Sequence, residues 1–143
     1  MEVEYKSGIE LAIKVIFGED FGLPVRLLSA KVETREIEEL ANAIELIESY
    51  NNFEGEAVAN ALRQMHNEGL IMEAGFGREQ SPVLYITPPF WTHQRTKPSK
   101  ERRQFTEQER NAMFRRIFEI LEKTNPDELD LVYGDYQVRA WWD

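Results

Sequence analysis

The sequence contains no cysteine, which excludes disulfide bonds, cysteine-ligated zinc sites and thiol nucleophiles. It also lacks an apolar run of about 18 residues, the length that a membrane-spanning helix needs. No apolar segment of signal-peptide length stands at its N-terminus. We therefore expect a protein of the cytoplasm or of another reducing compartment, without a membrane partner.

Catalytic signatures are missing as well. The two histidines, His66 and His93, lie in no cluster with the spacing of metal ligands, and the Walker phosphate-binding pattern is absent. Asp127 and Asp135 match a nuclease pattern only in part, because Gln137 stands where that pattern has a lysine. In a chain with 26 acidic residues, a pair of carboxylates carries no weight by itself. We predict no enzyme, no metal and no cofactor.

Charge is unevenly distributed along the chain. The net charge is −9, yet residues 91–116 hold eight basic and three acidic residues, a local charge of +5. The remainder therefore carries −14. Such a distribution permits an anionic partner at one place and discourages one elsewhere.

Length and composition predict a single domain over residues 1–143. Apolar residues make up 42% and charged residues 30%, which is ordinary for a globular chain that buries one core. We divide this domain into a central section, 34–87, a basic proline-containing linker, 88–105, and a C-terminal helix and tail, 106–143.

The central section begins with an acidic helix. Thr34 is suited to the N-cap, the helix should end near Tyr50, and its apolar residues recur every three or four positions. These residues are Ile37, Leu40, Ala41, Ile44 and Ile47. Between residues 33 and 56 there are eight glutamates and one arginine. This run is either a solvated helix face or an acidic docking face for a basic partner, with Glu38, Glu39 and Glu45 as its contacts.

A second helix is predicted over residues 54–68. Val58, Leu62 and Met65 form its buried stripe, and Gly69 stands where a left-handed residue commonly ends a helix. The opposite face carries Asn60, Arg63 and Gln64. Such side chains can form paired hydrogen bonds with base edges, although they are also ordinary surface residues.

An apolar strand at 70–74, a glycine-containing loop at 75–82 and a second strand at 83–87 follow. This order of elements, and the phrase Ala61–Ile71 in particular, resembles a winged helix-turn-helix. The resemblance covers about residues 34–87. It implies that Asn60, Arg63 and Gln64 lie on the base-reading helix and that Arg78 lies at the tip of the wing.

The linker combines aromatic and basic residues. Phe90 and Trp91 either cap the core or face a partner, and the basic side chains after them would hold phosphates in a nucleic-acid complex. These basic residues are Arg95, Lys97, Lys100, Arg102 and Arg103.

A third helix should begin after Thr106, because Thr106 and Glu109 match a capping box, and end near Lys123. Its apolar stripe is formed by Met113, Phe114, Ile117, Phe118 and Leu121. The stripe serves either the core or the seam of a homodimer.

The two ends of the chain are less clearly patterned. A short N-terminal helix is predicted after Ser7, and residues 25–32 suit either a strand or one turn of helix. Apolar and polar residues alternate in the tail, around a two-residue turn at Gly134-Asp135. We favour a hairpin there over a short helix beginning at Pro126. Trp141 and Trp142 cannot both be buried on one face of a strand, so one should pack and the other is a contact candidate.

The sequence thus predicts an α+β fold: a helical core with a small antiparallel sheet, a winged-helix-like centre, and a C-terminal helix followed by a hairpin. Our first functional hypothesis is a non-enzymatic, acidic protein-interaction or regulatory module, acting through Glu38, Glu39, Glu45, Trp141 and Trp142. The alternative is a winged-helix-type nucleic-acid-binding regulator that uses the helix at 54–69 and the basic arm at 95–116.

Overall fold

The computed structural model describes residues 8–18, 29–47, 52–89, 105–132 and 137–143. In this part of the chain, four helices and five strands make an α+β fold, and all strand pairings are antiparallel. The strands form one sheet in the order β1-β2-β3-β5-β4. Their bounds are β1 Ser29–Thr34, β2 Glu73–Glu79, β3 Ser81–Thr87, β4 Glu128–Val132 and β5 Gln137–Trp141.

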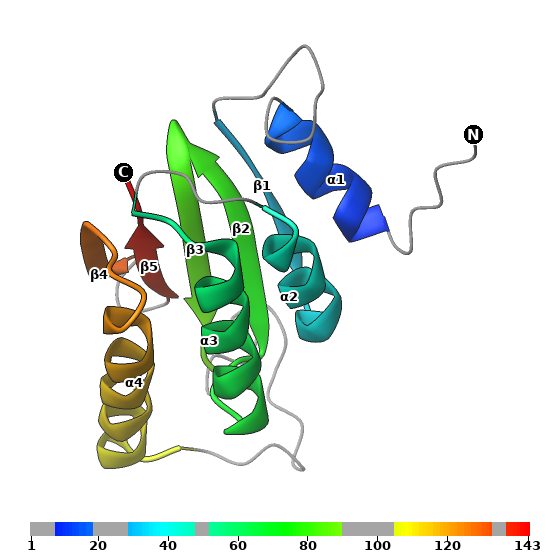
Figure 1. Cartoon of the computed structure of the whole chain (residues 1–143). Helices are drawn as coiled ribbons and strands as arrows, with labels where there is room; N and C mark the ends of the chain where they lie inside the picture. Colours follow the sequence, from blue (N-terminus) through cyan, green and yellow to red (C-terminus); the bar gives the residue numbers. More distant parts are fainter. Residues whose placement is uncertain (1–7, 19–28, 48–51, 90–104, 133–136) are drawn as a thin grey trace.

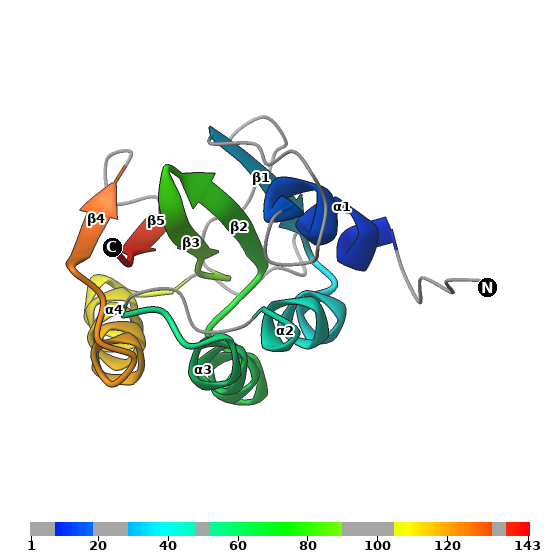
Figure 2. The ribbon, with the colours of Figure 1, turned by 45° about the horizontal axis from the view of Figure 1, so that its top comes forward.

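Three helices cover one face of this sheet. Figure 2 shows α2, α3 and α4 side by side along that face, while α1 lies beside β1 at one end of the sheet. The same arrangement is visible from the helical side in Figure 1. The helices are α1 Gly8–Ile16, α2 Ile37–Glu45, α3 Gly55–Asn67 and α4 Glu107–Glu122.

The hydrophobic core lies between the helices and the sheet. Along β5, Val138 and Ala140 are fully buried, and so is Trp142 just beyond the strand, as expected for alternate residues that share one face. An aromatic group fills the centre, because the ring of Phe53 packs 5.7 Å from that of Phe76 and 5.4 Å from that of Trp142. The predicted α3 stripe of Val58, Leu62 and Met65 is completely buried, as its spacing indicated.

The ends of the helices follow the expected local chemistry. The Thr106 hydroxyl accepts a hydrogen bond from the Glu109 amide at 3.1 Å, and the Glu109 carboxylate accepts one from the Thr106 amide at 3.3 Å. This capping box confirms the predicted start of α4, and Lys123 is its C-cap. Gly69 has a φ of +73° after the end of α3, a conformation that glycine adopts without strain.

Two boundaries in the central section differ from the prediction. Thr34 is not an N-cap but the last residue of β1, where it pairs with Ala74; α2 begins at Ile37, after Glu36. The Thr34 hydroxyl instead accepts a hydrogen bond from the Glu36 amide at 2.9 Å. Sheet pairing with β2 therefore outweighs the capping preference of this threonine. The predicted end of the helix near Tyr50 lies outside the described residues.

The predicted loop at 75–82 is wrong. Strand β2 continues to Glu79, the chain turns at Gln80 with a φ of +66°, and β3 begins at Ser81. Gly75 and Gly77, which the sequence predicts in this loop, lie inside a strand that is paired on both sides. The order helix, helix, strand, strand is present over residues 34–87, but here the two strands are inner strands of a five-stranded sheet.

At both ends of the chain, the structure selects one of the alternatives that the sequence left open. A hairpin of β4 and β5 forms the tail, as favoured; its turn, with Gly134 and Asp135, lies outside the described residues. The N-terminal helix is present as α1, and part of the 25–32 segment belongs to β1.

On α4, Phe114, Ile117 and Leu121 are buried in the core, together with Ile120. The homodimer stays a prediction. No helix among the described residues is long and apolar enough to cross a membrane.

Candidate functional site

The outer side of α2 carries the acidic residues that the sequence singled out. Glu38 and Glu45 lie seven residues apart, with Asn42 between them, so all three share the side of the helix that borders α3. Glu39 and Leu46 are also seven residues apart, so they share a stripe of their own. This second stripe is turned away from α3.

Arg63 of α3 forms hydrogen bonds with the first of these stripes and so links α2 to α3. Its guanidinium donates to both carboxylate oxygens of Glu45, at 3.3 and 3.1 Å, and to the side-chain oxygens of Asn42 and Asn60, each at 2.9 Å. We call these four residues the Arg63 cluster. A guanidinium presents its donors in a fixed plane, so four acceptors around it fix α2 relative to α3.

One helical turn further along α3, His66 stands opposite Glu38. The distance from His66 Nδ1 to Glu38 Oε1 is 3.3 Å, and both side chains are largely exposed. The described residues supply no hydrogen bond or ion pair to the Glu39 carboxylate. Leu46, on the same stripe as Glu39, is 49% exposed. The stripe turned away from α3 therefore presents an exposed leucine and a carboxylate that has no partner among the described residues.

A second link joins α3 to α4. Arg116 donates to both oxygens of the Glu68 carboxylate, at 2.7 and 2.9 Å, and to Glu119 at 3.3 Å. The Gln64 amide also donates to Glu68, at 3.1 Å. The hydrogen bonds from Arg116 and then Gln64 hold the pKa of Glu68 below its ordinary value, and those from Glu68 and Glu119 raise the pKa of Arg116.

Most of the residues that the nucleic-acid hypothesis assigns to base contacts belong to these two clusters. Asn60 and Arg63 face α2 within the Arg63 cluster, and Gln64 is bonded to Glu68. The side chain of Arg78 is not at a wing tip; it is 2% exposed, donates to the Gln80 carbonyl at 2.7 and 3.0 Å, and stacks over Phe17. This prediction failed because Arg78 was placed in a loop, whereas β2 turns it toward the core.

The basic arm at 95–116 lies only partly within the described residues, where its Arg116 is on α4 and binds Glu68. All of its linker residues lie outside the described part of the chain: Arg95, Lys97, Lys100, Arg102 and Arg103.

The two tryptophans of the tail have different surroundings. Trp142 is completely buried and its indole N–H donates to the Thr124 carbonyl at 2.9 Å, so it is not a contact residue. Trp141, on the opposite face of the sheet, is partly exposed and donates to the Glu79 carbonyl at 3.0 Å. Strand alternation predicted that one of the two would pack; it is Trp142 because that side chain faces the helices.

A polar cluster on the helix-free face of the sheet was missed by the sequence analysis. Glu79 accepts hydrogen bonds from the Tyr85 hydroxyl at 2.6 Å and from Arg139 at 2.8 Å, and Arg139 also binds Glu128 at 2.7 Å. Burial by itself would raise the pKa of Glu79, but the bonds from Tyr85 and Arg139 outweigh it and lower that pKa. These residues come from β2, β3, β4 and β5, so no local pattern could have joined them.

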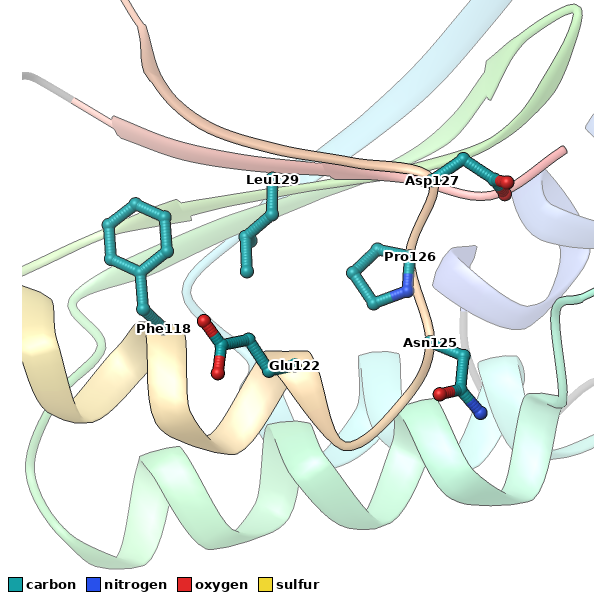
Figure 3. A pocket seen from close by; sticks show the side chains of 6 residues that line it. All are labelled: Phe118, Glu122, Asn125, Pro126, Asp127 and Leu129. Atoms are coloured by element: carbon teal, nitrogen blue, oxygen red, sulfur yellow. The ribbon is translucent and has the colours of Figure 1, made fainter.

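A pocket of about 420 Å³ opens between the end of α4 and β4. Figure 3 shows Phe118 and Glu122 on the helix, Leu129 pointing toward them from the strand, and Pro126 at the far wall. The carboxylate of Asp127 points away from the pocket, where it accepts hydrogen bonds from the Asp143 amide at 2.7 Å and the Asn52 side chain at 3.4 Å. The described residues supply no partner to the Glu122 carboxylate.

No group of three histidine, aspartate or glutamate side chains among the described residues is placed to hold a metal ion. Comparisons with protein families, with curated proteins and with solved structures found no match for this chain.

Proposed function

We propose that this protein is a non-enzymatic protein-interaction module that docks a basic partner on the outer side of α2. The observation that carries the proposal is the exposed stripe of Glu39 and Leu46. An apolar contact supplies affinity when it is buried in a complex, and a carboxylate beside it selects a cationic neighbour.

The rest of the helical layer supports this role. The Arg63 cluster on one side of α2 and α1 on the other hold the helix, so the stripe is presented on a fixed element. Preorganisation of this kind reduces the entropy that is lost on association. The charge of −14 outside residues 91–116 adds long-range attraction for a basic partner.

Substitution of both residues of the stripe tests the proposal. The double substitution Glu39→Lys with Leu46→Ser should abolish capture of the partner from a cell lysate, because it removes the apolar contact and reverses the charge. Glu45 is left unchanged, because reversing its charge would also break the Arg63 cluster. Helicity by circular dichroism should match that of the unmodified protein.

Glu56→Lys is the matched control. It makes the same charge change on an exposed residue of α3, away from the stripe, and should leave capture intact. If the double variant retained the partner, or if Glu56→Lys lost it equally, the outer side of α2 would not be the docking surface.

Nucleic-acid binding stays a prediction for the basic arm at 95–116. Of the nucleic-acid-binding residues predicted outside the arm, Asn60 and Arg63 lie in the contact between α2 and α3, Gln64 is bonded to Glu68, and Arg78 is buried. A nucleic acid would therefore have to be held mainly by the arm itself.

A further inference from the structure

We propose that the outer edge of β4 binds an extended peptide in which basic and aliphatic residues alternate, so that the peptide adds a sixth strand to the sheet. This site goes beyond the function proposed above, because it uses neither α2 nor its exposed stripe.

The edge itself is the first requirement. Within the described residues, β4 is the last strand of the sheet and pairs on one side only, with β5. Its residues are open to solvent, with Glu128, Asp130 and Leu131 exposed. At the opposite edge, α1 lies beside β1 (Figure 2). An exposed strand edge offers a row of backbone donors and acceptors to an incoming strand.

The two faces of β4 differ in chemistry. Leu129 and Leu131 lie on the face toward α4, where they stand opposite Ala140 and Val138 of β5. Glu128 and Asp130 lie on the other face, beside Arg139 and Glu79. Directly opposed side chains of neighbouring strands contact one another, and successive residues of a strand point to opposite faces. An added strand therefore meets leucines with every second residue and carboxylates with the residues between.

The pocket beside β4 extends the apolar face. Phe118 and Leu129 form its apolar wall, and Glu122 stands at its rim without a partner among the described residues (Figure 3). An aliphatic side chain directed toward α4 would enter this pocket and leave water. The lysines on either side of it would point to the opposite face, toward Glu128 and Asp130.

Charge complementarity identifies the occupant. Residues 118–131 contain five acidic residues and one lysine. On the carboxylate face of β4, Arg139 is the cation bonded to Glu79 and Glu128 and stands opposite Asp130. Lys31 of β1 also lies on this face, over the Tyr85 ring, and it is paired with Glu33. Excess negative charge excludes an acidic strand and favours a basic one, while the leucine face requires an aliphatic residue at every second position.

Fluorescence anisotropy with labelled peptides of about seven residues tests this inference. The probe alternates lysine and valine. One control peptide has the same composition arranged in two blocks, and another alternates glutamate and valine. We expect the alternating basic probe to bind at least about tenfold more tightly than either control. Equal binding of the alternating and block peptides would show that charge alone attracts them and would overturn the proposal.

Backbone methylation separates strand addition from other modes of binding. Two further probes carry N-methyl groups on alternate residues. In one probe the methyl groups block the amides that would face β4, and in the other they block the amides that would face solvent. Only one of them should lose binding, because an added strand directs every second amide toward its neighbour. Loss of binding by neither probe would contradict a paired strand.

Variants of the protein locate the site. Leu131→Lys and Asp130→Lys should each weaken the alternating probe about tenfold or more, whereas Glu39→Lys on α2 should leave its affinity unchanged. Both β4-side residues are exposed, so the fold should persist. The opposite result, with loss only in Glu39→Lys, would move the peptide to α2 and overturn this inference while leaving the proposed function standing. Absence of any binding would overturn the inference and would indicate that the charges of β4 prevent another strand from pairing with this edge.

Discussion

At the residue scale, Gly55 marks a close approach between the start of α3 and the end of α2. It is the first residue of α3, and a β-carbon at this position would lie 2.3 Å from the Ile47 carbonyl oxygen and 2.5 Å from that of Ile44. Both atoms belong to the backbone at the end of α2, so neither can rotate away. Close packing of α2 on α3 therefore depends on the absence of this side chain.

We expect Gly55→Ala to lower the free energy of unfolding by about 1–3 kcal/mol, because the added methyl group forces the ends of α2 and α3 apart. Urea denaturation measures the loss. Gly8→Ala is the control: it also places alanine at the first residue of a helix, but no atom lies within 4 Å of the added carbon. A similar loss in both variants would show that steric overlap is not the cause.

At the element scale, the contact between α2 and α3 combines this close packing with the Arg63 cluster. The Arg63 side chain is 23% exposed and that of Glu45 is 45% exposed. Partly exposed ion pairs contribute modestly, since water screens them and ordering two side chains costs entropy. The cluster should therefore fix the geometry of α2 more than it stabilises the fold.

A double-mutant cycle on Arg63→Ala and Glu45→Ala measures this contact. We expect a coupling of about 0.5–1 kcal/mol that decreases as salt is added. The pair Glu56→Ala with Arg63→Ala supplies the reference, because the structure shows no bond between those side chains. Coupling that persisted unchanged in high salt would indicate that packing, and not charge, joins the two residues.

The elements with local signals were predictable, and their assembly was not. The Thr106 capping box lies within one helical turn and the buried stripe of α3 within about two, so both could be predicted from neighbouring residues. Thr34 and Arg78 were misplaced because their conformations are set by β1–β2 and β2–β3 pairing. The position of β5 between β3 and β4 depends on residues far apart in the sequence, for which neither spacing nor composition gives a signal. The candidate sites inherit this division: the α2 acids were predicted, whereas the β4 edge required the sheet order.

At the scale of the whole molecule, two hydrogen-bonded carboxylates, those of Glu68 and Glu79, make stability depend on pH. Folding lowers the pKa of Glu68 and of Glu79 from an ordinary value of 4.5. The unfolded chain therefore binds protons more readily than the folded chain near that pH. It follows that the stabilisation from both groups is present above the ordinary pKa and is lost as the pH falls through the lowered values.

We expect the free energy of unfolding to decrease as the pH is lowered below about 4.5, and this decrease to be shallower in Glu79→Gln. Urea denaturation across the acidic range measures both slopes. The two proteins should differ most near neutral pH and converge in acid, where Glu79 is protonated. A difference that stayed constant down to the lowest pH would exclude the Glu79 carboxylate as its source.

The place of β5 in the sheet also bears on how the chain reaches its native state. β4 joins the rest of the sheet only through β5, and β5 must pair with β3, whose Thr87 lies 50 residues from Gln137. Closing so long a loop loses chain entropy before any stabilising contact has formed, so folding rates fall as such pairings increase. During synthesis, α1 through β3 can form early, but β3 has an unpaired side until β5 has been translated. Insertion of β5 should therefore be the late, rate-limiting event that completes the sheet.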